Sequence, residues 1–207
     1  IIDLEGGRQP LLNEDDTKVL VFNGEIYNYQ SLREDLLQKG HVFKTRTDSE
    51  TILHGYEEYG KEILQKLRGM FAFVIWDSVK KEFFGARDIF GIKPFYYYPV
   101  PDGSGLVFGS EIKAFLEHPK FVKAVNENAL RPYLTLQYSA TEETFFKGVY
   151  KLPEGHYFVY RDGEMSIHRY YDENFRESDQ KLGELVNTID DTVCGSVKAH
   201  QIADVEV

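Results

Sequence analysis

The run Met70-Phe71-Ala72-Phe73-Val74-Ile75-Trp76 is apolar without interruption. A strand with one face in water alternates apolar and polar side chains, whereas a strand covered on both faces is apolar throughout. Residues 77–81, which follow the run, can turn the chain into a second β-rich stretch. The sequence therefore predicts a strand at residues 70–76 that is buried on both faces.

Two turn signals and several further β-rich runs extend this prediction. Residues 18–22 (KVLVF) precede Asn23-Gly24, a dipeptide typical of tight hairpins because both residues tolerate positive φ. On these residues alone we expect a turn there, and Asp162-Gly163 predicts another hairpin. The other β-rich runs are 82–86, 94–98, 106–109, 155–161 and 164–171. Those in the middle of the chain predict an antiparallel meander.

Apolar residues at helical spacing predict several helices. Thr47 and Glu50 match the S/T-x-x-E capping box, so one helix is expected to begin near Asp48 and to end at Gly60. The last periodic stretch carries one apolar stripe, which favours an amphipathic helix packed against another surface. The expected helices are 29–39, 48–59, 61–67, 111–117, 126–136 and 182–197.

The composition is typical of a soluble globular protein of one or two domains. Among 207 residues, Asp and Glu number 34 against 24 Lys and Arg, a net charge of −10 that disfavours binding to a phosphate backbone. No apolar run approaches the roughly 20 residues that a membrane helix needs. We therefore expect no nucleic-acid partner, no membrane partner and a cytoplasmic location.

Cysteine and histidine do not indicate a metal site in the sequence. Cys194 is the single cysteine, which excludes an internal disulfide and fits a reducing cytoplasm. Because it lies beside the apolar stripe of the last expected helix, we expect a buried, unreactive thiol. The histidines show no ligand spacing, so no metal is assigned. They are His41, His54, His118, His156, His168 and His200.

Five motifs in a fixed order are more specific than any one of them. They are Asn23-Gly24-Glu25-Ile26-Tyr27-Asn28, Arg46-Thr47-Asp48-Ser49-Glu50, Arg68-Gly69-Met70-Phe71-Ala72-Phe73, Arg87-Asp88-x-x-Gly91-Ile92-Lys93-Pro94 and Gly109-Ser110-Glu111-Ile112-Lys113-Ala114. Together they resemble the class II glutamine amidotransferases, and most closely the glutamine-hydrolysing asparagine synthetases. The resemblance implies an α+β N-terminal-nucleophile hydrolase sandwich, with two antiparallel β-sheets between helical layers (αββα) and the first strands missing.

The resemblance also implies a domain organisation. Residues 1–171 correspond to a glutaminase domain without its N-terminus, and residues 172–207 to a linker and helix leading into an ATP-dependent synthetase domain. The intact protein is expected to hydrolyse glutamine and to use the ammonia, with ATP and Mg²⁺, to convert aspartate to asparagine. The family's nucleophile is an N-terminal cysteine outside this sequence, so we expect the chain alone to be inactive. No cofactor is expected within it, and a homodimer is compatible with the resemblance.

Amide hydrolysis needs donors aimed at the oxyanion of the tetrahedral intermediate. By the resemblance, the side-chain amide of Asn23 and the backbone N–H of Gly24 are these donors, and this interpretation replaces the hairpin turn. Asp48 corresponds to the carboxylate that pairs with the α-ammonium of glutamine. Its alternative role is that of a first-turn carboxylate favoured by the helix dipole.

Three further residues are expected in the glutamine pocket. By the resemblance, backbone groups of Ile1 and Ile2 touch glutamine. Glu25 either adds polar contacts or is only a strand residue.

Other interpretations of the chain remain open at this point. Arg87, Asp88 and Lys93 are expected to form a structural ion-pair cluster rather than to take part in catalysis. The protein is alternatively another class II amidotransferase, such as a glucosamine-phosphate synthase or a phosphoribosylpyrophosphate amidotransferase, although residues 151–171 argue against both. A non-catalytic glutamine-sensing or scaffold domain is the alternative from a different functional class.

Overall fold

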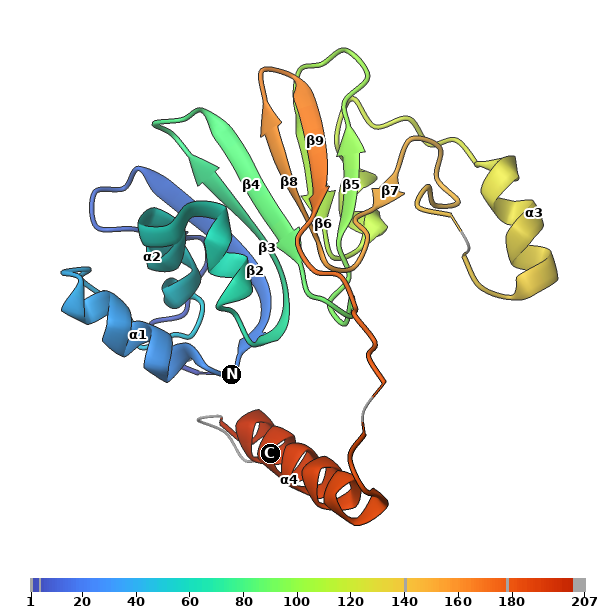
Figure 1. Cartoon of the computed structure of the whole chain (residues 1–207). Coiled ribbons are helices and arrows are strands. Elements are labelled where there is room, and N and C mark those ends of the chain that lie inside the picture. The colour runs from blue at the N-terminus through green and yellow to red at the C-terminus, as the bar shows by residue number, and fades with distance from the viewer. Residues whose placement is uncertain (1, 4, 140, 178, 203–207) are drawn as a thin grey trace.

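Two antiparallel β-sheets form the centre of the molecule (Figure 1). The computed structural model describes residues 2–3, 5–139, 141–177 and 179–202. Within them, six strands form a first sheet in the order β1-β2-β3-β4-β8-β9, and three form a second in the order β6-β5-β7. The first sheet comprises β1 (Leu11–Leu12), β2 (Lys18–Ile26), β3 (Gly69–Asp77), β4 (Glu82–Arg87), β8 (His156–Arg161) and β9 (Glu164–Arg169). The second comprises β5 (Tyr96–Pro99), β6 (Leu106–Gly109) and β7 (Tyr150–Lys151).

Strand β3 lies in the middle of the first sheet, and its two faces belong to different hydrophobic clusters. It pairs with β2 on one side and with β4 on the other. Phe71 and Phe73 pack in a cluster with the helices, whereas Ala72 and Val74 pack in a cluster with the second sheet. Residues 71–75 are all buried. The predicted strand with two buried faces is therefore confirmed.

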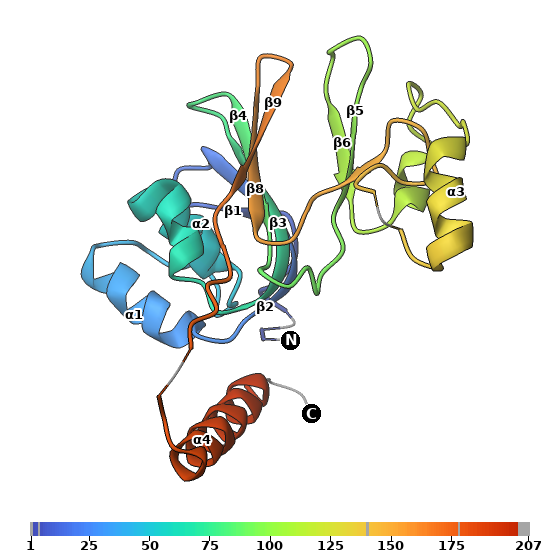
Figure 2. The same cartoon turned by 45° about the vertical axis from the view of Figure 1, so that its right-hand side comes forward.

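Helices cover one face of the first sheet, as Figure 2 shows. They are α1 (Tyr29–Gln38), α2 (Glu50–Tyr59) and the 3₁₀ helix η1 (Gly60–Gln65). Leu32 of α1 and Ile52 of α2 are buried in the cluster that also holds the apolar side chains of β2 and β3. The three helices predicted in this part of the chain are confirmed.

The second sheet packs on the opposite face of the first. Tyr97 of β5 shares a cluster with Phe158 of β8, so this cluster fills the space between the sheets. Beyond the second sheet lie the 3₁₀ helix η2 (Ile112–Phe115) and α3 (Glu127–Leu136), and Phe115 packs in a third cluster there. The layers run helix, sheet, sheet, helix, which confirms the predicted αββα sandwich.

The two turn signals in the sequence have different outcomes. Asp162 and Gly163 have φ of 52° and 83° and join β8 to β9, so this predicted hairpin is confirmed. The turn predicted at Asn23-Gly24 is wrong, because β2 continues through both residues to Ile26 in register with β3. Tolerance of positive φ permits a turn without requiring one, and here the long apolar partner strand extends the pairing.

The predicted meander is only partly correct. Strands β3 and β4 are neighbours in the first sheet, but β5 and β6 belong to the second. The chain changes sheet between Arg87 and Tyr96. Phe95, just before β5, packs in the cluster between the two sheets.

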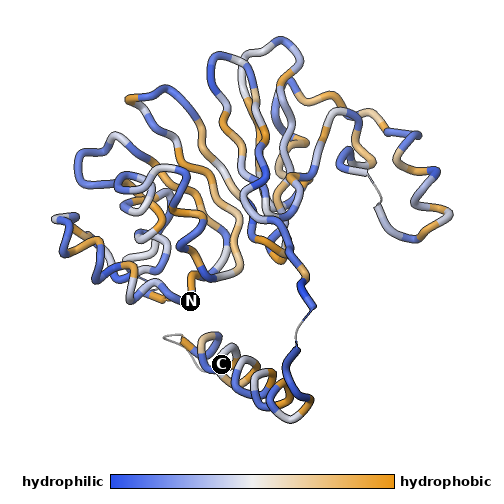
Figure 3. The backbone as a smooth tube through the Cα atoms, viewed as in Figure 1, coloured by the Kyte–Doolittle hydropathy of each residue, from blue (hydrophilic) through white to orange (hydrophobic). Residues whose placement is uncertain are grey.

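Helix α4 (Leu182–His200) lies apart from the sheets (Figures 1 and 2). Apolar and polar residues alternate along it (Figure 3), and none of its residues, all of which are described, is buried. The helix is confirmed, and its packing against a further surface stays a prediction. The ring centroid of His200, the last residue of the helix, lies 4.0 Å from that of Tyr27. The buried thiol predicted at Cys194 is wrong, because its side chain is exposed. The described helices include none that is long and apolar enough to cross a membrane.

Candidate functional site

A cavity of about 300 Å³ lies where β2, the start of α2 and the N-terminal segment meet. This volume is at the lower end of the range typical of small-molecule pockets, roughly 300–1,000 Å³. Its lining residues are Ile2, Asp3, Gly7, Gln9, Phe22, Asn23, Gly24, Thr47, Asp48 and Ser49. The structure thus brings together four residues singled out in the sequence, namely Ile2, Asn23, Gly24 and Asp48. Glu25 is not among the lining residues, and Ile1 lies outside the described residues.

Asp48 presents a buried carboxylate to this cavity. It lies two residues before α2, and its Oδ2 accepts a hydrogen bond from the backbone N–H of Ile26 at 2.7 Å. Burial raises the pKa of Asp48, and the nearby charge of Glu25 adds to this, while backbone N–H donors, including those of Ile26 and Ser49, oppose it. Among the described residues, none forms an ion pair with Asp48. A buried carboxylate without a cationic neighbour is suited to binding a ligand's ammonium group.

Asn23 connects this cavity to a second one between the sheets. Its side-chain Nδ2 donates a hydrogen bond to Ser110 Oγ at 2.9 Å, and Ser110 directly follows β6. Asn23 also lines the second cavity of about 180 Å³, together with Phe95 and Phe108. An amide nitrogen carries two N–H donors. Ser110 therefore holds the amide in position and leaves one donor available to a ligand.

Gly24 occupies a place where only glycine fits. A Cβ built on it would lie 2.1 Å from the carbonyl oxygen of Met70 and 2.7 Å from Cα of Phe71. Its φ of 156° is also one that other residues rarely adopt. The close approach of β2 to β3 therefore explains this glycine without any reference to a turn.

Side chains of the N-terminal segment complete the cavity, and sequence reasoning did not identify them. The Gln9 amide pairs with the backbone of Phe22, donating to its carbonyl at 2.7 Å and accepting from its N–H at 2.6 Å. Asp3 accepts from the N–H groups of Gly6 and Arg46, both at 2.9 Å. These residues carry no periodic pattern. Ser110, by contrast, belongs to the motif at residues 109–114, and that motif could have indicated it as a site residue.

The side chains of Arg87 and Asp88 form hydrogen bonds to the backbone, including that of Lys93, rather than the predicted ion-pair cluster. Their structural role stays a prediction. The Arg87 guanidinium donates to the carbonyls of Gly91, Lys93 and Leu152 at 2.6, 2.7 and 2.8 Å. Asp88 accepts from four backbone N–H groups at 2.9 to 3.2 Å, including that of Lys93. The chain leaves the first sheet here, so these side chains satisfy backbone groups that no strand pairs.

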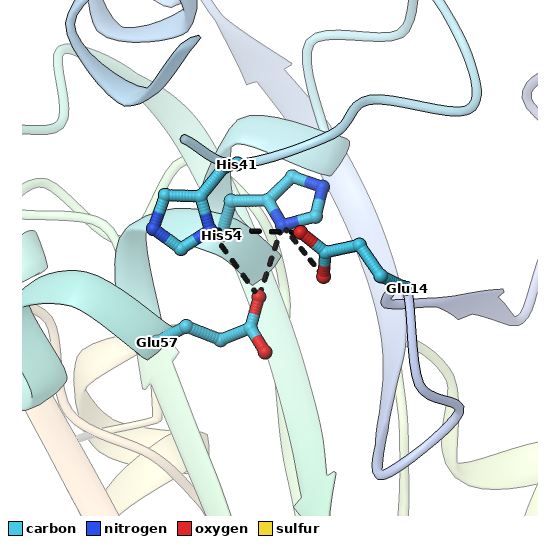
Figure 4. Close-up of side chains that lie close together, drawn as sticks. All are labelled: Glu14, His41, His54 and Glu57. Atoms are coloured by element: carbon cyan, nitrogen blue, oxygen red, sulfur yellow. Dashed lines mark hydrogen bonds and ion pairs between the residues drawn. The ribbon is translucent and has the colours of Figure 1, made fainter. Parts of the chain in front are cut away.

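Two histidines come together in a way that their positions in the sequence did not suggest. His41 and His54 lie with Glu14 and Glu57, and one ligand-type atom from each lies within 4.8 Å of the others (Figure 4). Spacing along the sequence could not indicate this group, because tertiary contacts alone bring His41 and His54 beside Glu14 and Glu57. The assignment of no metal stays a prediction.

Comparison with known proteins agrees with the fold and identifies the family. Residues 1–171 match the family described as the glutamine amidotransferase domain. Over its whole length the chain is 40% identical to asparagine synthetase [glutamine-hydrolyzing] 1 of Bacillus subtilis, and 34% identical to asparagine synthetase [glutamine-hydrolyzing] 3 of the same species. It covers 32% and 34% of these proteins, so the chain spans about a third of their length. Over 55% of the chain it is 51% identical to asparagine synthetase [glutamine-hydrolyzing] 3 of Arabidopsis thaliana, covering 19% of that protein.

Solved structures show the same fold at lower identity. Glutamine phosphoribosylpyrophosphate amidotransferase of B. subtilis, complexed with ADP and GMP, has a TM-score of 0.55 and 21% identity, over 80% of this chain and 32% of that chain. A structure described as the allosteric regulatory enzyme of purine biosynthesis has a TM-score of 0.57 and 21% identity, over 81% and 32%. The fold is that of the N-terminal-nucleophile amidotransferases. The chain belongs to the glutamine amidotransferase domain family.

Proposed function

We propose that this chain binds glutamine in the cavity lined by Asn23, Gly24 and Asp48, and that it is the glutamine-hydrolysing part of an asparagine synthetase. The observation that carries the proposal is the convergence of these residues on one cavity. The similarity to glutamine-hydrolysing asparagine synthetases along the whole chain supports it. The ammonia released would serve the ATP-dependent conversion of aspartate to asparagine in the cytoplasm.

The two ends of glutamine have different partners in this proposal. The α-ammonium pairs with Asp48, a charge-assisted contact worth roughly 1.5 to 3 kcal/mol. The side-chain carbonyl lies at Asn23 and Gly24, so the free amide N–H of Asn23 and the backbone N–H of Gly24 stabilise the developing oxyanion. Ser110 acts through Asn23, because the hydrogen bond between them holds the amide in place. Ile2 contributes backbone contacts at the cavity wall.

Residues 172–207 are proposed to lead from the glutaminase domain, residues 1–171, to an ATP-dependent synthetase domain. The exposed apolar stripe of α4 supports this, since such a stripe is normally covered by a partner surface. ATP, Mg²⁺ and aspartate would bind in that further domain rather than at residues of this chain.

The test uses the full-length product of the gene that encodes this chain. With glutamine, aspartate, ATP and Mg²⁺, it should form glutamate and asparagine in equal amounts. With ammonia in place of glutamine, it should still form asparagine. Glutamate release without any asparagine would contradict assignment to an asparagine synthetase. Asparagine formation with ammonia, together with none when glutamine is the nitrogen source, would contradict a functional glutamine site.

A further inference from the structure

A compact cluster of two histidines and two glutamates lies outside the glutamine cavity (Figure 4). Glu14 comes from the loop between β1 and β2, and His41 from the loop after α1. His54 and Glu57 lie one turn apart on α2. Three segments therefore contribute side chains to one point.

The spacing of the inward-facing atoms is close to that of a four-coordinate metal site. His54 Nδ1 lies 2.9 Å from Glu57 Oε2 and 3.5 Å from Glu14 Oε2. His41 Nδ1 lies 3.7 Å from Glu14 Oε1 and 3.8 Å from Glu57 Oε2. In a tetrahedral zinc site, bonds of roughly 2.0 to 2.2 Å place ligand atoms about 3.3 to 3.6 Å apart. One ligand-type atom from each residue lies within 4.8 Å of the others, so the more widely separated atoms would move together by up to about 1 Å when a metal binds.

The outward-facing nitrogen of each histidine lies beside a second carboxylate. His54 Nε2 is 3.4 Å from Glu50 Oε1, and His41 Nε2 is 3.3 Å from Glu58 Oε2. A metal-bound histidine almost always donates its other ring N–H to a carboxylate, a carbonyl or water, which fixes the tautomer and the ring orientation. Both imidazoles therefore have carboxylates beside each of their two ring nitrogens, as metal-bound histidines commonly do. A simple ion pair needs a carboxylate beside only one nitrogen.

The surroundings hold these carboxylates in place and leave a path for a cation. Glu50 accepts from the backbone N–H groups of Lys44 and Thr45, both at 2.7 Å. Glu57 accepts from Asn13 Nδ2 at 2.6 Å through the oxygen that does not face the histidines. The His54 side chain is fully buried, whereas 34% of the Glu14 side chain is exposed, so the cluster opens to solvent at Glu14.

We propose that Glu14, His41, His54 and Glu57 form a structural binding site for a divalent transition metal, with Zn²⁺ the best match. Two imidazole nitrogens and two carboxylate oxygens suit zinc, whereas Mg²⁺ and Ca²⁺ prefer oxygen ligands alone. The two carboxylates neutralise the charge of the ion. Four protein ligands leave no open position, which is the pattern of a structural rather than a catalytic zinc site.

Without a metal, a proton on His54 takes the place of the cation. Burial lowers the pKa of His54, but hydrogen bonds to Glu50 and Glu57 and the charge of Glu14 outweigh it and raise the pKa to about 9. The competing explanation is therefore a network of an imidazolium and carboxylates that binds no metal. The two explanations differ in what added zinc does.

The first experiment titrates Zn²⁺ into the metal-stripped 207-residue chain by calorimetry, with Mg²⁺ and Ca²⁺ in parallel. We expect one Zn²⁺ per chain, no binding of the other two ions, and a rise in thermal midpoint with Zn²⁺. Co²⁺ in place of Zn²⁺ should give the intense visible absorption of tetrahedral coordination. Absence of stoichiometric Zn²⁺ binding would overturn the proposal in favour of the proton-only network.

Variants locate the bound ion. Glu58→Gln removes the carboxylate beside the outward-facing nitrogen of His41 and should lower the Zn²⁺ affinity by roughly 10- to 100-fold. Glu14→Gln and His41→Gln alter partly exposed ligands and should lower it by more. The matched controls Glu62→Gln and His168→Gln change exposed residues outside the cluster and should bind Zn²⁺ as the parent does. Equal affinity in the ligand variants and the controls would overturn the assignment.

A spectroscopic measurement on the unaltered chain covers the case in which a variant does not fold. X-ray absorption at the zinc edge should show scattering from two imidazole rings. A bound zinc without imidazole ligands would also overturn the proposal. The proposal is independent of the glutamine site, because none of these measurements involves glutamine.

Discussion

The carboxylate of Asp48 accepts a hydrogen bond from the backbone N–H of Ile26 at 2.7 Å. This bond joins the segment just before α2 to the last residue of β2. The Asp48 side chain therefore binds to the sheet and does not act only on the N-terminus of α2. This contact holds Asp48 in the cavity that Asn23 and Gly24 also line. The two roles considered for Asp48 make different predictions for a single substitution.

Asp48→Asn should weaken glutamine binding by about ten- to a hundredfold, because the charge-assisted contact with the α-ammonium is worth roughly 1.5 to 3 kcal/mol. Asparagine keeps an oxygen that can accept from Ile26. The measurement is direct glutamine binding to the full-length protein with its nucleophile disabled. Asp190→Asn, on the exposed face of α4, is the matched control. Unchanged affinity in Asp48→Asn would remove Asp48 from the site.

The same substitution should have a pH-dependent effect on the stability of the unliganded protein. The pKa of Asp48 is raised by burial, so the ionised side chain costs stability above that pKa. As the pH falls through the raised pKa, Asp48 takes up a proton in the folded protein before it does so in the unfolded chain. The loss of stability caused by the buried charge then disappears. Asp48→Asn should therefore be more stable than the parent at neutral pH, by a margin that shrinks toward acid. Urea unfolding of both proteins across this pH range measures the margin, and a margin that grows toward acid would contradict the argument.

Sequence patterns correctly predicted the elements that depend on residues close together in the chain. The apolar run at residues 70–76 indicated β3, because a strand covered on both faces needs no polar alternation. Gly60 indicated the end of α2 correctly, and it has a φ of 58° there. The Asn23-Gly24 signal failed as a turn because strand pairing with β3 outweighed a local preference. Its assignment to the ligand cavity came from the ordered motifs rather than from the dipeptide.

The remaining features depend on contacts between distant residues. The side-chain amide of Gln9 forms two hydrogen bonds with the backbone of Phe22, as a neighbouring strand would. Nothing in the polar segment around Gln9 indicates these bonds. His41 and His54 meet Glu14 only because the loop before β2 lies against α2. For such residues, spacing along the chain carries no information until the layers are assembled.

Gly24→Ala should destabilise the protein by roughly 1 to 3 kcal/mol or more, because its Cβ would clash with the carbonyl oxygen of Met70. The backbone of β2 cannot move away without losing its pairing with β3. Gly105→Ala is the matched control, since a Cβ there meets nothing within 4 Å. Chemical denaturation measures both variants. If they prove equally stable, the close approach of the two strands does not explain the glycine.

Arg87→Lys tests whether the Arg87 network is structural. A lysine keeps the charge but cannot reach the carbonyls of Gly91, Lys93 and Leu152 with the same planar arrangement of donors. Leaving buried carbonyls without partners should cost about 1 to 3 kcal/mol of stability. Glutamine affinity should be unchanged where the variant is folded. A selective loss of glutamine affinity at parental stability would instead place Arg87 in the binding site.

Asn23→Ala should separate glutamine hydrolysis from the rest of the activity. Removing one oxyanion donor lowers kcat by roughly 10² to 10³ in comparable sites, so glutaminase kcat should fall by that factor. Asparagine synthesis from added ammonia bypasses the site and should change little. Ser110→Ala, which only frees the Asn23 amide to rotate, should produce a smaller loss of the same kind. Both activities are measured on the full-length protein, and an equal fall in the two would mean that Asn23 supports the fold rather than the chemistry.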